Sequence, residues 1–134
     1  MDIITKMEIV APASTVFEAF VDPKEIGGFW FSSSSKRWET GKNIVLRYDE
    51  YDAEVEIKVK AVIPNENIEF QWGDKTVTIN FESYDDKTLV TTKESAFDSS
   101  EVERMLGQKE GWVYMLSCLK AYIEHGVQIR AGLQ

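Results

Sequence analysis

The 134 residues of this chain are enough for one domain of ordinary size with a buried core. Hydrophobic residues make up 43% of the chain and charged residues 28%, which is typical of a folded globular protein and excludes a disordered or membrane-embedded one. Fifteen basic residues against 23 acidic ones give a net charge of −8, and the basic residues are scattered among carboxylates. Such a surface repels polyanions, so nucleic acid and anionic membranes are not expected as partners.

The sequence also predicts a compartment. The longest apolar run is only a few residues, too short to insert into a membrane. Residues 1–6 lack the basic flank and long apolar run of a secretory signal. The single cysteine, Cys118, cannot form an internal disulfide and agrees with a reducing environment. We therefore expect a cytoplasmic protein that folds as a single domain over residues 1–134.

Short elements are expected at the start of the chain, where residues 3–10 read as a first strand. Pro12 then favours the start of a short helix with one apolar side. The residues on that side are Val16, Phe17, Phe20 and Val21. A second helical turn, residues 23–26, is expected to end at the glycine pair 27–28, directly before the aromatic run 29–31.

In the middle of the chain the hydrophobic period changes to two, as in strands with one buried face. The clearest strand is 54–61, where apolar residues alternate with Glu and Lys. Residues 68–72 and 77–81 are expected to pair as a hairpin that turns at Gly73. A further strand is expected at 88–96, which gives an antiparallel series.

One long amphipathic helix is expected from Glu101 to His125, ending at Gly126. Its apolar residues recur every three or four positions, as in a helix that packs on a core. They are Met105, Leu106, Trp112, Val113, Met115, Leu116, Leu119, Tyr122 and Ile123. A curved sheet gripping this helix would bury the stripe and leave an apolar cavity between the two layers. The sequence therefore predicts an α+β fold with two short helices after the first strand.

Several individually weak motifs, taken together in order, resemble a known family. They are Ile9, Pro12, Val16, Phe17, Phe20, Pro23, Trp30, Phe31, Gly41, Thr88-Leu89-Val90, Glu94-Ser95-Ala96-Phe97, Gly111-Trp112, Leu116, Leu119 and Lys120. Over essentially the whole chain, these residues resemble the homologues of the ATPase activator of heat-shock protein 90. Two positions depart from the family pattern: a pair of glycines precedes Phe29, and Ala96 stands where glycine is common.

The resemblance implies the helix-grip fold of the superfamily that includes steroid-transfer-related and birch-pollen-allergen-like lipid-binding domains. In that fold a curved antiparallel sheet wraps around a long C-terminal helix. The resemblance leaves the activity open. Relatives in the superfamily carry hydrophobic ligands or act as cyclases or aromatases, and the eukaryotic co-chaperone uses such a domain to contact its chaperone.

Residues that could carry catalysis or bind a metal are few. His125 falls in the expected last turn of the helix, where an imidazole can bond carbonyls and oppose the helix dipole. Cys118 falls in mid-helix beside apolar residues, as a small buried hydrophobe does. The acidic run 49–54 lacks the glycine turn and ligand spacing of a calcium loop. No catalytic residue, metal site or cofactor is expected.

Glu94 has two interpretations. If residues 88, 90, 92 and 94 face the helix, its carboxylate stands at the edge of an apolar cavity and could orient a ligand hydroxyl or act as acid or base. The opposite register of the strand places Glu94 in water. The second interpretation is the favoured one, because a single sequence fixes strand register poorly.

Aromatic residues give the best indication of function, because both the sheet and the helices contribute them. Any single one is expected to fill the core, but together they indicate a cavity that the curved sheet keeps open beneath the helix. The expected ligand-binding residues are Phe29, Trp30, Phe31, Trp38, Tyr48, Ile57, Phe70, Trp72, Phe81, Glu94, Trp112, Leu116 and Leu119.

Three functions remain open at this point. The first is a non-catalytic carrier or sensor of a small hydrophobic molecule, which would be a planar aromatic compound, a sterol-like compound or a lipid. Such a protein could act in a stress response. The second is a protein-interaction module that contacts a chaperone. The third is a cyclase- or aromatase-like enzyme in which Glu94 or a tyrosine acts as acid or base.

Overall fold

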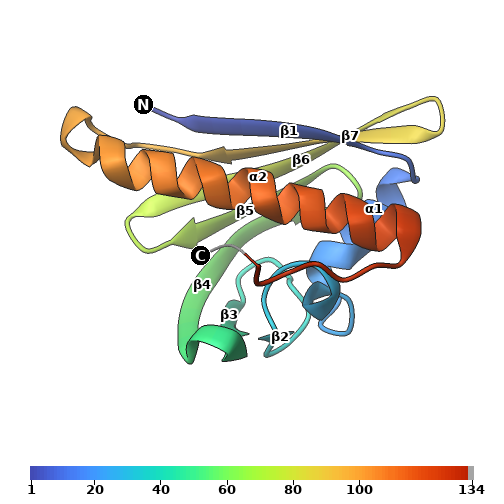
Figure 1. Ribbon diagram of the computed structural model, residues 1–134, viewed down its shortest axis with the longest axis horizontal. Coiled ribbons are helices and arrows are strands. Elements are labelled where there is room, and N and C mark those ends of the chain that lie inside the picture. The colour runs from blue at the N-terminus through green and yellow to red at the C-terminus, as the bar shows by residue number, and fades with distance from the viewer. Residues whose placement is uncertain (133–134) are drawn as a thin grey trace.

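A computed structural model describes residues 1–132 as one curved antiparallel sheet with a long helix lying across its concave face (Figure 1). The seven strands are β1 (Ile3–Ile9), β2 (Ser33–Ser34), β3 (Asn43–Tyr48), β4 (Ala53–Ile63), β5 (Asn67–Trp72), β6 (Lys75–Tyr84) and β7 (Lys87–Glu94), in the spatial order β1-β7-β6-β5-β4-β3-β2. The helices are α1 (Ala13–Val21) and α2 (Val102–His125), with 3-10 turns η1 (Ile26–Gly28), η2 (Asp49–Tyr51) and η3 (Ser99–Glu101). The predicted α+β helix-grip fold is confirmed.

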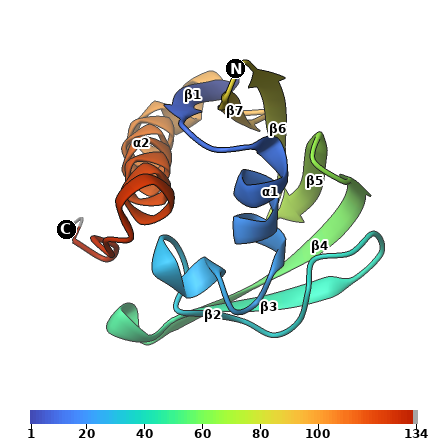
Figure 2. The same cartoon turned by 90° about the vertical axis from the view of Figure 1, so that its right-hand side faces the viewer.

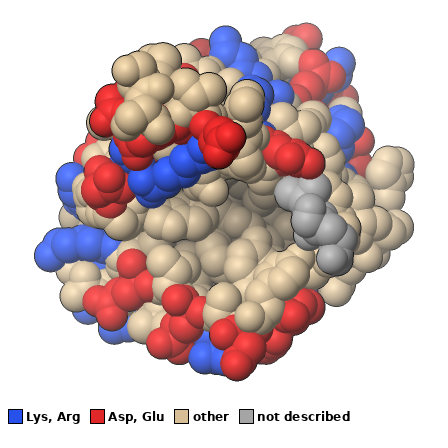
Figure 3. All heavy atoms as spheres, turned by 60° about the vertical axis from the view of Figure 1, so that its left-hand side comes forward, with Lys and Arg blue, Asp and Glu red and all other residues tan. Residues whose placement is uncertain are grey.

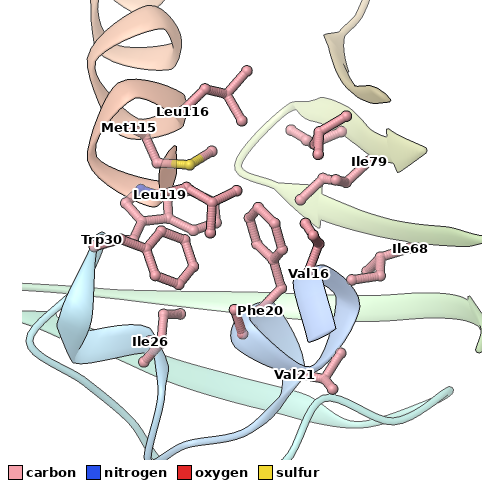
Figure 4. Close-up of a cluster of buried hydrophobic side chains, with 14 of the residues drawn as sticks. Val16, Phe20, Val21, Ile26, Trp30, Ile68, Ile79, Met115, Leu116 and Leu119 are labelled. Carbon is pink, nitrogen blue, oxygen red and sulfur yellow. The ribbon is translucent and has the colours of Figure 1, made fainter. Parts of the chain in front are cut away.

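The core lies between the sheet and the two helices, with α1 inside the curve of the sheet (Figure 2). Buried side chains from α1, the loop after η1, the strands and α2 pack against one another there (Figure 4). Val16, Phe20 and Leu116, for example, have no exposed surface. The apolar side that the sequence predicts for the first helix is confirmed, because all four of its residues are buried.

The predicted stripe of α2 is partly wrong. Its buried residues include Trp112, Met115, Leu116 and Leu119, but the side chains of Leu106 and Val113 are 66% and 42% exposed. Residues that follow one another on a helix point about 100° apart, so Leu106 and Met105 do not both face the sheet. The predicted end of the helix is confirmed, because Gly126 has a φ of 66° and its N–H caps the last turn.

The second helical turn is also displaced from its predicted place. The glycine pair was expected to end a turn at residues 23–26, but Gly28 lies inside η1. A β-carbon on Gly28 would lie 2.3 Å from the ring of Tyr122, so this glycine lets the end of α2 approach η1 closely. The departure from the family pattern thus has a packing reason.

Polar contacts hold α2 beside β1, the edge strand of the sheet. Lys109 Nζ donates to the carbonyl of Ile4 at 2.7 Å, and Lys120 Nζ donates to the carbonyl of Glu8 at 2.7 Å. These lysines satisfy edge carbonyls that would otherwise invite another strand. Because α2 follows β1 at one border of the sheet, the helix lies far from β3 and β2 at the other border (Figure 2). None of the helices within residues 1–132 is both long and apolar enough to cross a membrane.

Candidate ligand-binding cleft

Two adjoining hollows open between α2 and the β3 side of the sheet. The larger one has a volume of about 350 Å³, and its lining residues are Phe29, Trp30, Tyr48, Tyr51, Gly107, Glu110, Gly111, Tyr114, Met115, Cys118, Arg130 and Ala131. The smaller one has a volume of about 170 Å³ and is lined by Trp30, Tyr48, Trp72, Gln108, Gly111 and Trp112. Because the two share Trp30, Tyr48 and Gly111, we treat them as one cleft. In Figure 3 this side of the molecule is hollowed, with uncharged residues inside and charged residues around the rim.

Two glycines of α2 leave room for the cleft. Gly107 and Gly111 are four residues apart and therefore lie on one side of the helix, and both line the cleft. A β-carbon built on either glycine has no heavy atom within 4 Å. Any larger side chain at these positions would project into the open space, because glycine is the only residue without a side chain. The cavity therefore depends on residue types that are unfavourable in a helix interior.

One wall of the cleft is a cluster of indole rings. The ring centroids of Trp30 and Trp72 are 6.0 Å apart, those of Trp30 and Trp112 are 5.6 Å apart, and those of Trp72 and Trp112 are 5.8 Å apart. Phe31 supports the cluster from behind, with its ring 4.9 Å from Trp30 and 5.9 Å from Trp72. Rings that brace one another in this way give a rigid apolar wall.

Tyr48 brings a polar group into the cleft. It ends β3 and lines both hollows, and burial raises the pKa of its phenol to about 12. The hydroxyl is therefore protonated at neutral pH. None of the hydrogen bonds within residues 1–132 involves it, so it is available to a ligand.

Glu94 lies directly behind the cleft wall. Its side chain is 1% exposed, because β7 turns residues 88, 90, 92 and 94 toward the interior. The favoured interpretation, which placed Glu94 in water, is wrong: its pairing with Ile3 and Val77 fixes the other register. Glu94 Oε1 accepts hydrogen bonds from Trp112 Nε1 at 2.9 Å and from Gln108 Nε2 at 3.0 Å. Both donor residues line the smaller hollow.

Residues 126–132, which we term the C-terminal segment, close one side of the cleft. Arg130 donates from Nε to the carbonyl of Trp30 at 2.7 Å and from Nη2 to Glu50 Oε1 at 2.9 Å. A second guanidinium nitrogen bonds the other carboxylate oxygen, and this bidentate pair lowers the pKa of Glu50 to about 2. The Tyr114 hydroxyl also donates to the carbonyl of Ile129. The C-terminal segment is thereby fixed to both η2 and α2.

The predicted site residues divide into two groups. Five of them line the cleft: Phe29, Trp30, Tyr48, Trp72 and Trp112. The others are buried and do not line it: Phe31, Trp38, Ile57, Phe70, Phe81, Glu94, Leu116 and Leu119. Trp38, for example, packs edge-on against Phe70 at 5.2 Å, in closed core.

Several lining residues were not predicted as site residues. They are Tyr51, Gly107, Gln108, Glu110, Gly111, Tyr114, Met115, Cys118, Arg130 and Ala131. The two helix glycines carry a signal in the sequence, since Gly is rare in mid-helix and their spacing of four puts them on one side. No sequence pattern indicates Arg130, because the hydrophobic residues of the C-terminal segment follow no regular period. Burial raises the pKa of the Cys118 thiol, which leaves it protonated at neutral pH, as expected of a buried hydrophobe.

The fold and the cleft can now be compared with known proteins. The model of one protein family, described as activator of Hsp90 ATPase homolog 1-like protein, matches residues 10–124. The chain belongs to this family. No curated protein matches it.

Solved structures share the fold of this chain. A Staphylococcus saprophyticus protein is 63% identical, with a TM-score of 0.94 over 98% of each chain. The Aha1 dimer from Colwellia psychrerythraea is 19% identical, with a TM-score of 0.82 over 98% of this chain and 99% of that one. DynU16, a protein of the dynemicin biosynthetic locus, is 22% identical, with a TM-score of 0.84 over 95% of this chain and 48% of that one. The last two likenesses show a shared fold alone.

Proposed function

We propose that this protein binds a small hydrophobic molecule in the cleft and acts as its carrier or sensor. The observation that carries the proposal is the open space beside Gly107 and Gly111, opposite a wall of indole rings. A helix that served only to cover the sheet would gain stability from larger residues there. Glycines that instead keep an aromatic-walled hollow open are consistent with a ligand site.

The size of the cleft restricts the ligand. The two hollows, at about 350 and 170 Å³, together fall in the lower half of the range of ligand sites, which is roughly 300–1,000 Å³. A compact planar ring compound fits this space better than a sterol. The Tyr48 hydroxyl would give such a ligand one hydrogen bond in otherwise apolar surroundings.

Titration with compact aromatic compounds tests the proposal. Saturable changes in tryptophan emission and in the amide shifts of α2, together with a negative heat-capacity change, are the expected results. Gly111→Leu should abolish the changes by filling the cleft. Val113→Leu is the matched control, because Val113 is exposed on the same helix and does not line the cleft, and it should bind as the parent protein does.

The titration and the recovery of the ligand distinguish a carrier from an enzyme and from a protein that binds no ligand. A ligand recovered unchanged after long incubation supports a carrier, whereas a converted compound would make the protein an enzyme. If no compound gives saturable shifts, or if the shifts map only to the convex face of the sheet, the carrier proposal fails.

A chaperone-contacting module is the second candidate. Family membership favours it, and so does an exposed apolar patch where α2 borders β1. In that patch the side chains of Ile4 and Leu106 are 50% and 66% exposed. Stimulation of the ATPase of an Hsp90-type chaperone by the parent protein, lost in Leu106→Glu but kept in Gly111→Leu, would place the working surface there and not in the cleft.

A further inference from the structure

The smaller hollow is enclosed mainly by aromatic rings. Trp30, Trp72, Trp112 and Tyr48 supply four of the six residues that line it. The faces of aromatic rings carry partial negative charge, and several rings around one small space form a favourable site for an organic cation.

A buried carboxylate lies behind the same hollow. Glu94 is 1% exposed, and among the ion pairs of residues 1–132 none involves it. Both of its oxygens accept N–H hydrogen bonds from neutral donors, Oε1 from Trp112 and Gln108 and Oε2 from Gln108 at 3.3 Å. A buried negative charge without a cationic partner is costly, so a cation across the wall would be stabilising.

Three cationic side chains, on elements that pack near Glu94 or line the cleft, bond other groups. Lys75 bonds Glu101 at 2.9 Å, and Lys109 bonds Thr5 Oγ1 at 3.0 Å. Arg130, which lines the larger hollow, is held by Glu50. None of these three forms an ion pair with Glu94.

Gln108 supplies a polar atom to the smaller hollow. Its amide nitrogen is directed to Glu94, and its carbonyl oxygen makes no hydrogen bond within residues 1–132. An amide oxygen of this kind can accept an N–H bond from an ammonium group.

From these contacts we infer that the smaller hollow binds the ammonium group of an amine whose apolar body occupies the larger hollow. The inference rests on the proposed function and narrows its ligand class to hydrophobic amines. The net charge of −8 favours the approach of a cation, and Glu110 adds a carboxylate to the lining of the larger hollow.

Three probes with one apolar body and different charges test this inference: 4-phenylbutylamine, 4-phenylbutanol and 4-phenylbutanoate. At neutral pH the amine is a cation, the alcohol is neutral and the acid is an anion. We expect the amine to bind about tenfold more tightly than the alcohol, and the carboxylate to bind most weakly. Calorimetry gives the affinities, and amide shifts of Trp72 and Trp112 locate the probe.

Glu94→Gln isolates the role of the carboxylate. It should reduce the tenfold preference for the amine over the alcohol to the smaller part that the aromatic rings supply, about threefold, while leaving alcohol binding unchanged. Glu56→Gln changes the net charge equally on an exposed position of β4 and should keep the preference. Trp72→Leu keeps an apolar side chain but removes a ring, so it should lower amine affinity more than alcohol affinity. This variant tests the ammonium site independently if Glu94→Gln fails to fold.

The outcomes separate this inference from the proposed function. Equal binding of amine and alcohol, or tighter binding of the carboxylate, would overturn the ammonium site and leave a hydrophobic ligand in place. A preference for the amine that stays tenfold in both Glu94→Gln and Trp72→Leu would also overturn it. Absence of binding by all three probes would remove the inference together with the function on which it rests.

Discussion

Ala96 has a φ of 75°, in the left-handed region that residues with a β-carbon rarely occupy. Relief of this strain by Ala96→Gly should exceed the entropy that glycine gains in the unfolded chain, so the free energy of unfolding should rise by about 0.5–1 kcal/mol. Ala121→Gly, in α2, is the control and should lower stability by about 1 kcal/mol. Denaturant titration measures both, and a loss of stability in Ala96→Gly would contradict the assigned strain.

The Glu50–Arg130 pair makes the C-terminal segment sensitive to acid. The pKa of Glu50 is lowered to about 2 from an ordinary value of 4.5, so the folded state favours the carboxylate. The stabilising contribution is complete above pH 4.5 and is lost as the pH falls toward 2. The hydrogen-exchange protection factors of the bonded amides of Val127 and Gly132 should therefore fall over this interval before that of Leu116.

Glu50→Gln is the control for this acid response. It should lower the protection factors of the same two amides already at neutral pH, because a neutral amide cannot form the bidentate ion pair. If the segment and the core lose protection together, Glu50 does not control the segment.

The same substitution should have opposite effects at the glycines of α2 and at the glycine of η1 that packs against it. Gly107→Ala and Gly111→Ala add a methyl group to open space and should each stabilise the protein by about 0.5–1 kcal/mol. Gly28→Ala should cost about 1–3 kcal/mol, since the ring of Tyr122 that it would strike is held by a 2.7 Å bond to Glu25. Thermal unfolding of the three variants is the measurement, and destabilisation by Gly111→Ala would show that the cleft is not open.

The inner face of α2 supports a second prediction at this scale. Leu116 has no exposed surface, so Leu116→Ala should lower the free energy of unfolding by about 2–5 kcal/mol. Val113→Ala removes a side chain that is 42% exposed and should change stability by less than about 0.5 kcal/mol. Similar losses in the two variants would mean that the helix is rotated from its assigned orientation.

For the whole molecule, charge decides which partners are excluded. A net charge of −8, with no basic surface assembled in the sequence, predicts no salt-dependent binding to duplex DNA at physiological ionic strength. Fluorescence anisotropy with a labelled duplex measures this, and a basic DNA-binding protein gives the positive control. A micromolar complex that weakens steeply with added salt would contradict the prediction.

The sequence by itself determined the class of fold and most of the elements. The period of two in residues 54–59 and the period of three and four in α2 arise from backbone geometry, so they can be read locally. Five of the cleft-lining residues were predicted for a similar reason, because large aromatic residues concentrate where layers meet. Local pattern could not separate them from aromatic residues in closed core such as Trp38.

Only the tertiary structure decided the register of Glu94, the opening beside Gly107 and Gly111, and the place of Arg130. Register depends on which residues of β1 and β6 pair with β7, and a shift by one residue exchanges the two faces of a strand. The opening depends on how far α2 stands from β3, a distance set by contacts along β1 at the opposite border of the sheet. Arg130 and its acceptor, the Trp30 carbonyl, are a hundred residues apart, and no pattern within either segment encodes their contact.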